Sequence, residues 1–242
     1  MIDFEHTFGS GAMTTDSLTM RVTNYIFDHI RKNQLSSGEG LPSELKTSTE
    51  LNVSRGVVRE AFRSLEVAGI IEKENGRSPK VGVLNSAFLT HLIGHALLTR
   101  QVSLKQVLEL RASIEVKAAE LAARRRTRSD VQRLRIAVEG MKQSVAKFNS
   151  FVQHDLDFHQ VINGATGNPL VQVVCSAMHE SIKESMRAGL RKRKGPEEIM
   201  KVAEAHEAIA DAIEQGNAAQ AEGRMKKHFD ETFRVFGRLD ED

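Results

Sequence analysis

The sequence predicts a mainly α-helical protein, in which an N-terminal winged helix-turn-helix precedes an antiparallel all-helical bundle. Two observations lead to this fold class. Residues 42–83 hold two short helical patterns, a tight turn between them and an Asn-Gly hairpin signal, in that order. From about residue 85 onward, apolar residues recur at helical spacing and no strand pattern intervenes.

The chain has 242 residues, enough for two domains that each bury a core. We expect a disordered tail at 1–14, a winged helix-turn-helix domain at 15–83, a linker at 84–88 and a helical domain at 89–237. The tail lacks periodicity and contains Gly-Ser-Gly. An amphipathic first helix is predicted at about 16–33.

The helix-turn-helix itself follows from capping residues and spacing. A helix is predicted from about Ser43 to Leu51, and Asn52 and Val53 form the turn. Ser54 suits the N-cap of the second helix, because its hydroxyl can accept a bond from a free first-turn amide. Gly69 lies where a left-handed C-terminal cap is favoured. The buried stripe of this helix is predicted at Val57, Val58, Ala61, Leu65 and Ala68.

A separate face of the second helix carries Arg55, Arg59 and Arg63 at successive turns. Short strands are predicted at about 70–73 and 80–83, on either side of the Asn-Gly turn. The second helix of such a motif enters a major groove, where arginine can grip phosphate or read guanine. The alternative is a helical hairpin with solvated arginines and an unrelated turn, and the ordered set of features argues against it.

Three segments resemble the DNA-binding domain of the GntR superfamily of bacterial transcription regulators: LPSE at 41–44, VSRGVVREAFRSLEVAG at 53–69 and ENGRSPKV at 74–81. The resemblance implies DNA contacts by Ser54, Arg55, Gly56 and Arg59 on the recognition helix and by Asn75, Gly76 and Arg77 at the wing tip. Many members carry Arg directly after the LPSE-like segment. Here Leu45 and Lys46 follow instead, so we expect an altered operator preference.

Composition limits the classes of function. The net charge is only +2, so DNA binding must come from a local basic patch. The single cysteine, Cys175, excludes an internal disulfide and fits a reducing cytoplasm. There is no tryptophan and one tyrosine, which argues against a single-strand binder that stacks bases on aromatic rings. No apolar run is long enough to cross a bilayer, and we expect a cytoplasmic protein without membrane contact.

The bundle helices are predicted at about 103–124, 129–148, 151–163, 170–190, 197–215 and 217–237. Gly195-Pro196 and Gly216-Asn217 separate the last three, since proline cannot continue a helix interior. Two cationic runs, RRRTR at 124–128 and RKRK at 191–194, are expected at helix ends, where cations favour the helix dipole. Auxiliary contact with DNA or an effector is the alternative for these runs.

Four polar side chains fall on apolar helix faces. Asp155 and His159 are four residues apart and share a face, while His206 and His228 each lie on the apolar stripe of a later helix. A single histidine on such a face is more often a hydrogen-bonded core residue. Three imidazoles and one carboxylate together suit a divalent transition metal. We assign His154 and His179 to the surface or a pocket rim.

The segments LELRASIE at 108–115, DLDFHQVINGATGNPL at 155–170 and EAHEAIADAIEQGNAAQAEGRMKKH at 204–228 resemble the FCD effector domain, which defines the FadR branch of the superfamily. The resemblance implies an FCD-type bundle and a metal held by Asp155, His159, His206 and His228. The expected cofactor is zinc, with nickel, manganese or iron as alternatives.

Arg111 lies on the inward stripe of its helix, and a buried guanidinium needs an anionic partner. One possible partner is Glu115, four residues on. The other is an effector carboxylate lying over the metal, as the family implies, and the two partners can alternate. Arg111 is thus the candidate effector-binding residue.

We therefore expect a homodimeric, non-enzymatic transcription regulator, a repressor rather than an activator. Its winged helix would bind a palindromic double-stranded DNA operator, and its bundle would dimerise, hold the metal and sense a small organic acid. The effector would favour a spacing of the two DNA-binding heads that no longer fits both half-sites. A metalloenzyme is the main rival, although no clear general base and no H-E-x-x-H pattern occur. A nonspecific DNA-binding protein is disfavoured by the small net charge.

Overall fold

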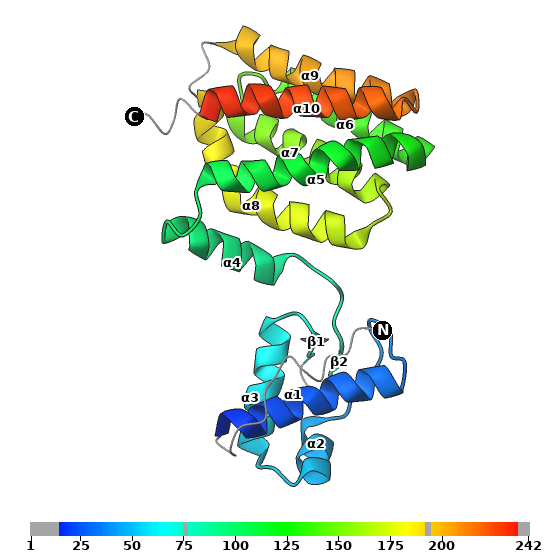
Figure 1. Cartoon of the computed structure of the whole chain (residues 1–242), viewed down its shortest axis with the longest axis vertical. Coiled ribbons are helices and arrows are strands. Elements are labelled where there is room, and N and C mark those ends of the chain that lie inside the picture. Colours follow the sequence, from blue (N-terminus) through cyan, green and yellow to red (C-terminus); the bar gives the residue numbers. More distant parts are fainter. Residues whose placement is uncertain (1–14, 75–76, 192–194, 237–242) are drawn as a thin grey trace. The chain divides into compact units, whose positions relative to one another are not determined.

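The computed structural model describes residues 15–74, 77–191 and 195–236. The chain forms two compact units, the first ending at Phe88 and the second beginning at Leu89 (Figure 1). The predicted mainly α-helical fold, with a winged helix-turn-helix before an all-helical bundle, is confirmed. The expected tail at 1–14 lies outside the described residues.

The first unit holds α1 (Thr15–Lys32), α2 (Glu44–Leu51), α3 (Arg55–Val67), β1 (Ile71–Glu72) and β2 (Lys80–Val81). The predicted caps are present, because the Ser43 hydroxyl accepts from the Lys46 amide at 3.2 Å and the Ser54 hydroxyl from the Val57 amide at 3.3 Å. Asn52 ends α2 in the left-handed conformation at φ 50°. These caps fix the tight turn between the two helices.

The core of this unit differs in detail from the prediction. The buried stripe of α3 is Val58, Ala61, Phe62 and Leu65, whereas Val57 and Ala68 are only partly buried. Phe62 was missed, although it follows Val58 by one helical turn. The two strands are shorter than predicted and pair antiparallel, with Ile71 opposite Val81.

Glycine is needed where the wing meets the end of α3. Gly69 has φ +73°, the left-handed value predicted for it. A Cβ on Gly82 would lie 2.3 Å from the Gly69 carbonyl oxygen. The Gly82 amide donates to the Ile70 carbonyl at 2.9 Å, so two backbone segments touch here without side chains between them. The wing can therefore pack only with glycine at position 82.

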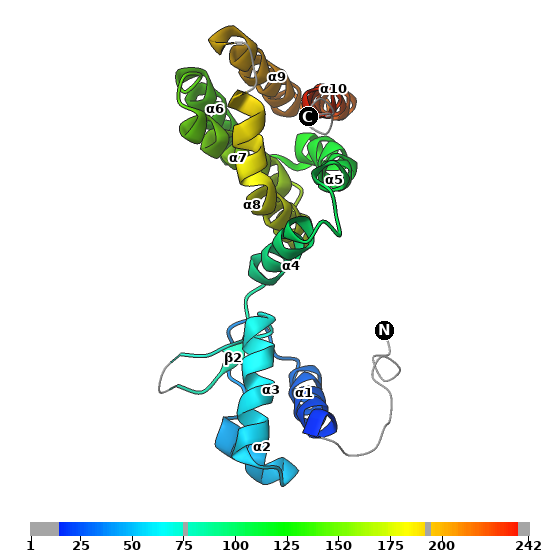
Figure 2. The same ribbon diagram turned by 90° about the vertical axis from the view of Figure 1, so that its left-hand side faces the viewer.

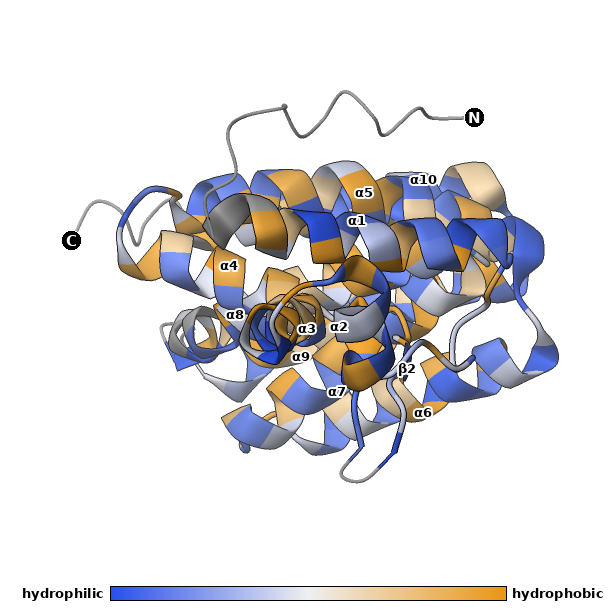
Figure 3. Ribbon diagram, turned by 90° about the horizontal axis from the view of Figure 1, so that it is seen from below, coloured by the Kyte–Doolittle hydropathy of each residue, from blue (hydrophilic) through white to orange (hydrophobic). Residues whose placement is uncertain are grey.

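The second unit is a bundle of helices: α4 (Ala87–Leu98), α5 (Leu104–Arg125), α6 (Arg128–Gln143), α7 (Phe148–Ala165), α8 (Pro169–Arg191), α9 (Pro196–Glu214) and α10 (Ala218–Phe236). α5 packs against α7, α8, α9 and α10, while α6 packs against α7 and α9. Several of them are seen close to end-on in Figure 2. Hydrophobic and hydrophilic residues alternate along the helices, as amphipathic elements require (Figure 3).

Two features of the bundle differ from the sequence prediction. The helix expected at 129–148 ends at Gln143, and α7 begins at Phe148, three residues before the predicted start. α4 was not predicted as a separate helix. It has no buried residue in the described structure, and Phe88, Leu92 and Leu98 are exposed, while Ile93 and Leu97 pack against α5 and α8.

The first cationic run lies at helix ends, as expected. The Arg125 guanidinium donates to the Thr166 carbonyl, and Arg126 donates to the carbonyls of Ala123 at 2.9 Å and Glu214 at 3.1 Å. These arginines satisfy carbonyls left free at three helix ends. Lys192, Arg193 and Lys194 of the second run lie outside the described residues.

Candidate metal centre and nucleic-acid interface

Three helices of the bundle bring the four predicted metal-ligating side chains together. α7 supplies Asp155 and His159 one turn apart, α9 supplies His206 and α10 supplies His228. Asp155 Oδ1 lies 3.0 Å from His206 Nε2, and the Nε2 atoms of His159 and His206 lie 3.4 Å apart. One nitrogen from each of the three histidines falls within 4.8 Å of the other two. Two ligands of a tetrahedral zinc ion lie roughly 3.3 Å apart, so the spacing suits such an ion.

Polar contacts on the outer side of two rings indicate which nitrogens carry lone pairs. His206 Nδ1 lies 2.7 Å from the Val202 carbonyl oxygen. A carbonyl only accepts, so His206 is protonated at Nδ1. His159 Nδ1 lies 2.5 Å from Glu115 Oε2, a separation that two unprotonated acceptors would not adopt. When the rings are neutral, both Nε2 atoms therefore present lone pairs to each other, beside a carboxylate oxygen. This donor set fits a cation.

The electrostatics of the cluster favour a neutral His228 and an ionised Asp155. Burial, together with His206 and His159, holds the pKa of His228 well below its usual value. Burial acts to raise the pKa of Asp155, but a protonated His206, whose Nε2–H then donates to Asp155, and the positive charges of His159 and His228 outweigh it and lower that pKa. A metal ion requires these same protonation states, because it binds to neutral imidazole and to ionised carboxylate.

Glu115 was predicted only as a possible partner of Arg111, and the structure contains that pair. Glu115 is fully buried, and its Oε1 lies 2.9 Å from Arg111 Nε and 2.7 Å from His179 Nε2. Burial acts to raise the pKa of Glu115, but Arg111, His159 and His179 outweigh it and hold the pKa well below its usual value. The buried carboxylate is therefore a shared acceptor for three helices.

The assignment of His179 to the surface or a pocket rim was wrong. Its side chain is buried at 1% exposure against Glu115, and burial together with Arg111 lowers its pKa to about 4. Helical spacing on α8 could have placed it inside, since Cys175, Met178 and Ile182 on the same face are buried. His154 is partly exposed and packs against Gly140 on α6.

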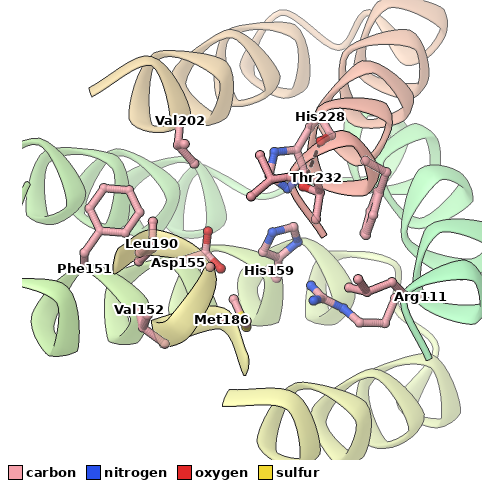
Figure 4. A pocket seen from close by; sticks show the side chains of 14 residues that line it. Arg111, Phe151, Val152, Asp155, His159, Met186, Leu190, Val202, His228 and Thr232 are labelled. Atoms are coloured by element: carbon pink, nitrogen blue, oxygen red, sulfur yellow. Dashed lines mark hydrogen bonds between the residues drawn. The ribbon is translucent and has the colours of Figure 1, made fainter. Parts of the chain in front are cut away.

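A cavity of about 60 Å³ lies beside the histidines. Arg111, Asp155, His159 and His228 from three helices border the same space, as Figure 4 shows. The rest of the lining is mainly apolar, with Thr232 as an added hydroxyl. His228 also lines a wider groove between α9 and α10. The cavity can therefore hold a small molecule between the guanidinium and the histidine cluster.

The predicted DNA-contacting residues of α3 share the exposed start of that helix. Ser54, Arg55, Gly56 and Arg59 are all exposed. The guanidinium groups of Arg55 and Arg59 form no ion pair within the described part of the chain. They are therefore available to phosphates or base edges.

The wing is described only in part. Arg77 is exposed and pairs with Glu74 at 2.5 Å, a surface ion pair of small energy that DNA can replace. Asn75 and Gly76 lie outside the described residues. Leu45, in the place where many family members carry arginine, is 54% exposed at the start of α2.

Comparison with known proteins decides the family. Residues 18–81 match the model of the bacterial regulatory proteins of the gntR family, and residues 106–231 match the FCD domain. The chain belongs to the GntR family. Its FCD domain fits the FadR-type branch, and the regulator is a DNA-binding transcription factor rather than an enzyme, like its relatives.

Two relatives illustrate the similarity. The regulator is 30% identical to the HTH-type transcriptional regulator LutR of Bacillus subtilis, over 82% of this chain and 92% of that protein. It is 26% identical to the HTH-type transcriptional repressor NanR of Cronobacter sakazakii, over 96% and 90% of the two chains. The solved structure of Streptococcus agalactiae GntR shares the fold, with a TM-score of 0.62 and 23% identity over 89% of this chain and 99% of that one.

None of the helices in the described ranges combines the length and the apolar character needed to cross a bilayer.

Proposed function

We propose that the regulator is a homodimeric repressor that binds a palindromic operator. Residues 15–83 would form the DNA-binding domain, 84–88 the linker and 89–237 the effector-binding and dimerisation domain. Ser54, Arg55, Gly56 and Arg59 would enter the major groove, and the wing tip with Asn75, Gly76 and Arg77 would reach the minor groove. Arg55 and Arg59 are exposed and form no ion pair with the residues that the structure describes, which supports this proposal, as does the description of NanR as a repressor.

The second part of the proposal is a divalent metal ion held by Asp155, His159, His206 and His228, with zinc preferred to nickel, manganese or iron. The observation that carries it is the pair of facing Nε2 atoms, 3.4 Å apart, beside the Asp155 carboxylate. Neutral imidazoles repel each other in this arrangement unless a cation lies between them. When bound, the metal would supply an electrophilic centre for a ligand oxygen.

The third part is a small carboxylate effector that occupies the cavity between Arg111 and the metal position. Arg111 offsets one of the two buried carboxylates, Glu115 and Asp155, so the cluster has one net negative charge when its histidines are neutral. A divalent ion would change this to one net positive charge. A monocarboxylate would neutralise it, and the guanidinium edge of Arg111 would orient that carboxylate. Without the metal, the same anion would be repelled by the net negative charge of the cluster.

Native mass spectrometry of protein purified without added metal or chelator tests this proposal. The expected species is a dimer with about one metal ion per chain, with or without an added small mass. A protein that lacks metal and fails to take up added Zn²⁺ would contradict the metal site. The three histidines would then be core residues, and the function would rest on the DNA-binding domain.

Operator binding in the presence of candidate acids tests the effector separately. Fluorescence anisotropy with the Zn²⁺-loaded regulator should identify a small monocarboxylate that weakens binding, and Arg111→Gln should abolish the response. If the metal has only a structural role, the result should differ. Substitution of His206 should then lower the thermal stability without changing how the effector alters operator binding.

A further inference from the structure

The Glu115 carboxylate contacts two histidines in addition to its ion pair with Arg111. A carboxylate that only paired with arginine would accept two parallel bonds from the guanidinium fork. Here Arg111 makes one good bond, from Nε to Oε1 at 2.9 Å, and a marginal one from Nη2 to Oε2 at 3.5 Å. The shortest contact of Oε2 is instead with His159 Nδ1, at 2.5 Å. One oxygen of Glu115 thus faces arginine and the other faces histidine.

Among the described residues the buried Nδ1 of His159 forms no hydrogen bond of regular geometry, and its close polar contact is Glu115 Oε2 at 2.5 Å. An uncharged imidazole carries its proton on one nitrogen, and the hydrogen bond made by that nitrogen selects the tautomer. A buried carboxylate beside Nδ1 favours the proton there. The lone pair is then left on Nε2, which faces His206 at 3.4 Å.

Two further groups keep Glu115 ionised and in place. Arg111 lies one turn before it on α5, and His179 approaches from α8 with Nε2 at 2.7 Å from Oε1. Arg111 and His179 therefore make their shortest contacts with Oε1, while the shortest contact of Oε2 is with His159. All three partners are buried, so water competes little for the carboxylate.

We propose that Glu115 is the positioning residue of the metal centre: it accepts the Nδ1–H of His159 and thereby directs the Nε2 lone pair of that histidine at the metal position. The inference rests on the proposed metal function and adds a residue outside the four ligands. The proposed bond requires a rotation of the His159 ring that points its N–H at the carboxylate oxygen, since the two atoms are close but do not form a hydrogen bond of regular geometry. Metal-ligating histidines commonly have such an acceptor, and its loss costs about 10–100-fold in metal affinity.

The tautomer can be measured directly in the full-length regulator. Long-range ¹H–¹⁵N spectra of protein labelled with ¹⁵N-histidine, stripped of metal and held at pH 8, distinguish the two neutral forms, and His159→Gln identifies the resonances of His159. We expect the Nδ1–H form in the wild type and a shift toward the Nε2–H form in Glu115→Gln. A wild-type His159 protonated at Nε2, or a form unchanged in Glu115→Gln, would overturn the inference.

Competition with a colorimetric chelator for Zn²⁺ gives a second measurement. Glu115→Gln should weaken Zn²⁺ binding by about 10–100-fold. The matched control is Glu120→Gln, which makes the same change on α5 but whose carboxylate pairs with Lys117 and Arg124, away from the histidine cluster, and it should bind Zn²⁺ like the wild type. Equal affinities for all three proteins would also overturn the inference.

The two proposals fail in different ways. If the wild type takes up no Zn²⁺, the proposed metal function is wrong, whereas the wild-type tautomer still decides the role of Glu115. If Glu115→Gln does not fold, the wild-type spectrum remains decisive, since it requires no substitution at Glu115 and uses only His159→Gln to assign the resonances.

Discussion

The imidazole rings of His159 and His206 meet nearly edge to face, with an interplanar angle of 85° and their Nε2 atoms toward each other. The Glu115 carboxylate of α5 lies behind the His159 ring, and the Val202 carbonyl of α9 lies behind the His206 ring. This arrangement has an energetic consequence. A bound cation would relieve the repulsion of the two lone pairs, so metal binding and stability of the bundle should be linked.

Zn²⁺ should raise the melting temperature of the wild-type regulator, and His206→Ala should abolish most of that increase. A ligand present at a hundred times its Kd contributes about 2.7 kcal/mol of stability. Differential scanning calorimetry with Zn²⁺ or with a chelator measures the difference. His154→Ala is the control, because His154 packs outside the cluster against Gly140. An equal increase in the His206 and His154 variants would count against the site.

Arg59→Ala should weaken specific operator binding by about 1–3 kcal/mol if the guanidinium reads a base. If it contacts phosphate instead, binding should fall for every sequence and the dependence of affinity on salt should decrease. Anisotropy titrations with operator and scrambled DNA at several salt concentrations separate these cases. The control is Arg133→Ala. It removes the same charge from an exposed side chain of α6 in the bundle and should leave DNA binding intact. Unchanged operator affinity in Arg59→Ala would exclude this face of α3.

Gly56→Ala should stabilise the fold and weaken DNA binding at the same time. A Cβ at position 56 would meet only the Ser54 hydroxyl oxygen, at 3.8 Å, so no packing within the described chain requires glycine there. Alanine favours a helix over glycine by up to about 1 kcal/mol. The added methyl group would stand between the start of α3 and the DNA backbone.

Gly94→Ala on α4 is the matched control for that substitution, because a Cβ there also meets open space. It should give a similar gain in stability and leave operator affinity unchanged. Chemical denaturation and anisotropy together provide both readouts. Tight operator binding by Gly56→Ala would argue against a close approach of this helix end to DNA.

Gly82→Ala should destabilise the DNA-binding unit by about 2–3 kcal/mol, since overpacking against fixed neighbours costs that much. The obstacle is the backbone oxygen of Gly69, which cannot turn away as a flexible side chain could. Hydrogen exchange of the α3 and wing amides reports the loss locally. Gly40→Ala, where the added Cβ meets nothing within 4 Å, should have a much smaller effect.

Tyr25 should make the stability of the first unit fall between about pH 10 and 12. Its hydroxyl donates to Glu50 on α2, and burial followed by this bond raises the pKa of Tyr25 to about 12. Because the unfolded tyrosine ionises near pH 10, the unfolded state loses the proton first as pH rises. The contribution is present in full below pH 10. Denaturation of Tyr25→Phe should show a flatter pH dependence across this window, and an equal slope would contradict the assignment.

Local signals explain which parts of the fold could be predicted from the sequence. The roles of Ser54 and Gly69 depend only on residues within one turn of the chain. Ser54 is the expected helix cap, and Gly69 has the expected left-handed conformation. The spacing of Asp155 and His159 placed both on one inward face. α4 was not predicted because apolar residues occur on all sides of it, so its two faces cannot be told apart by periodicity.

The buried polar network could not be predicted in the same way. The environment of Glu115 depends on Arg111 from its own helix, His159 from α7 and His179 from α8. Only the packing of three helices brings these groups together, and no short stretch of sequence contains the relationship. A charged residue on an inward stripe predicts that partners exist, but not which partners they are.

Cys175 is fully buried between α5 and α8, where burial raises the pKa of its thiol. As the chain has no other cysteine, the native regulator offers no reactive sulfur to a spectroscopic reagent. A cysteine introduced at the exposed position of Val67 on α3 would be the single attachment point for a nitroxide in each subunit. Dipolar electron spin resonance between the two labels of a dimer would then measure the separation of the DNA-binding heads in solution, with and without metal.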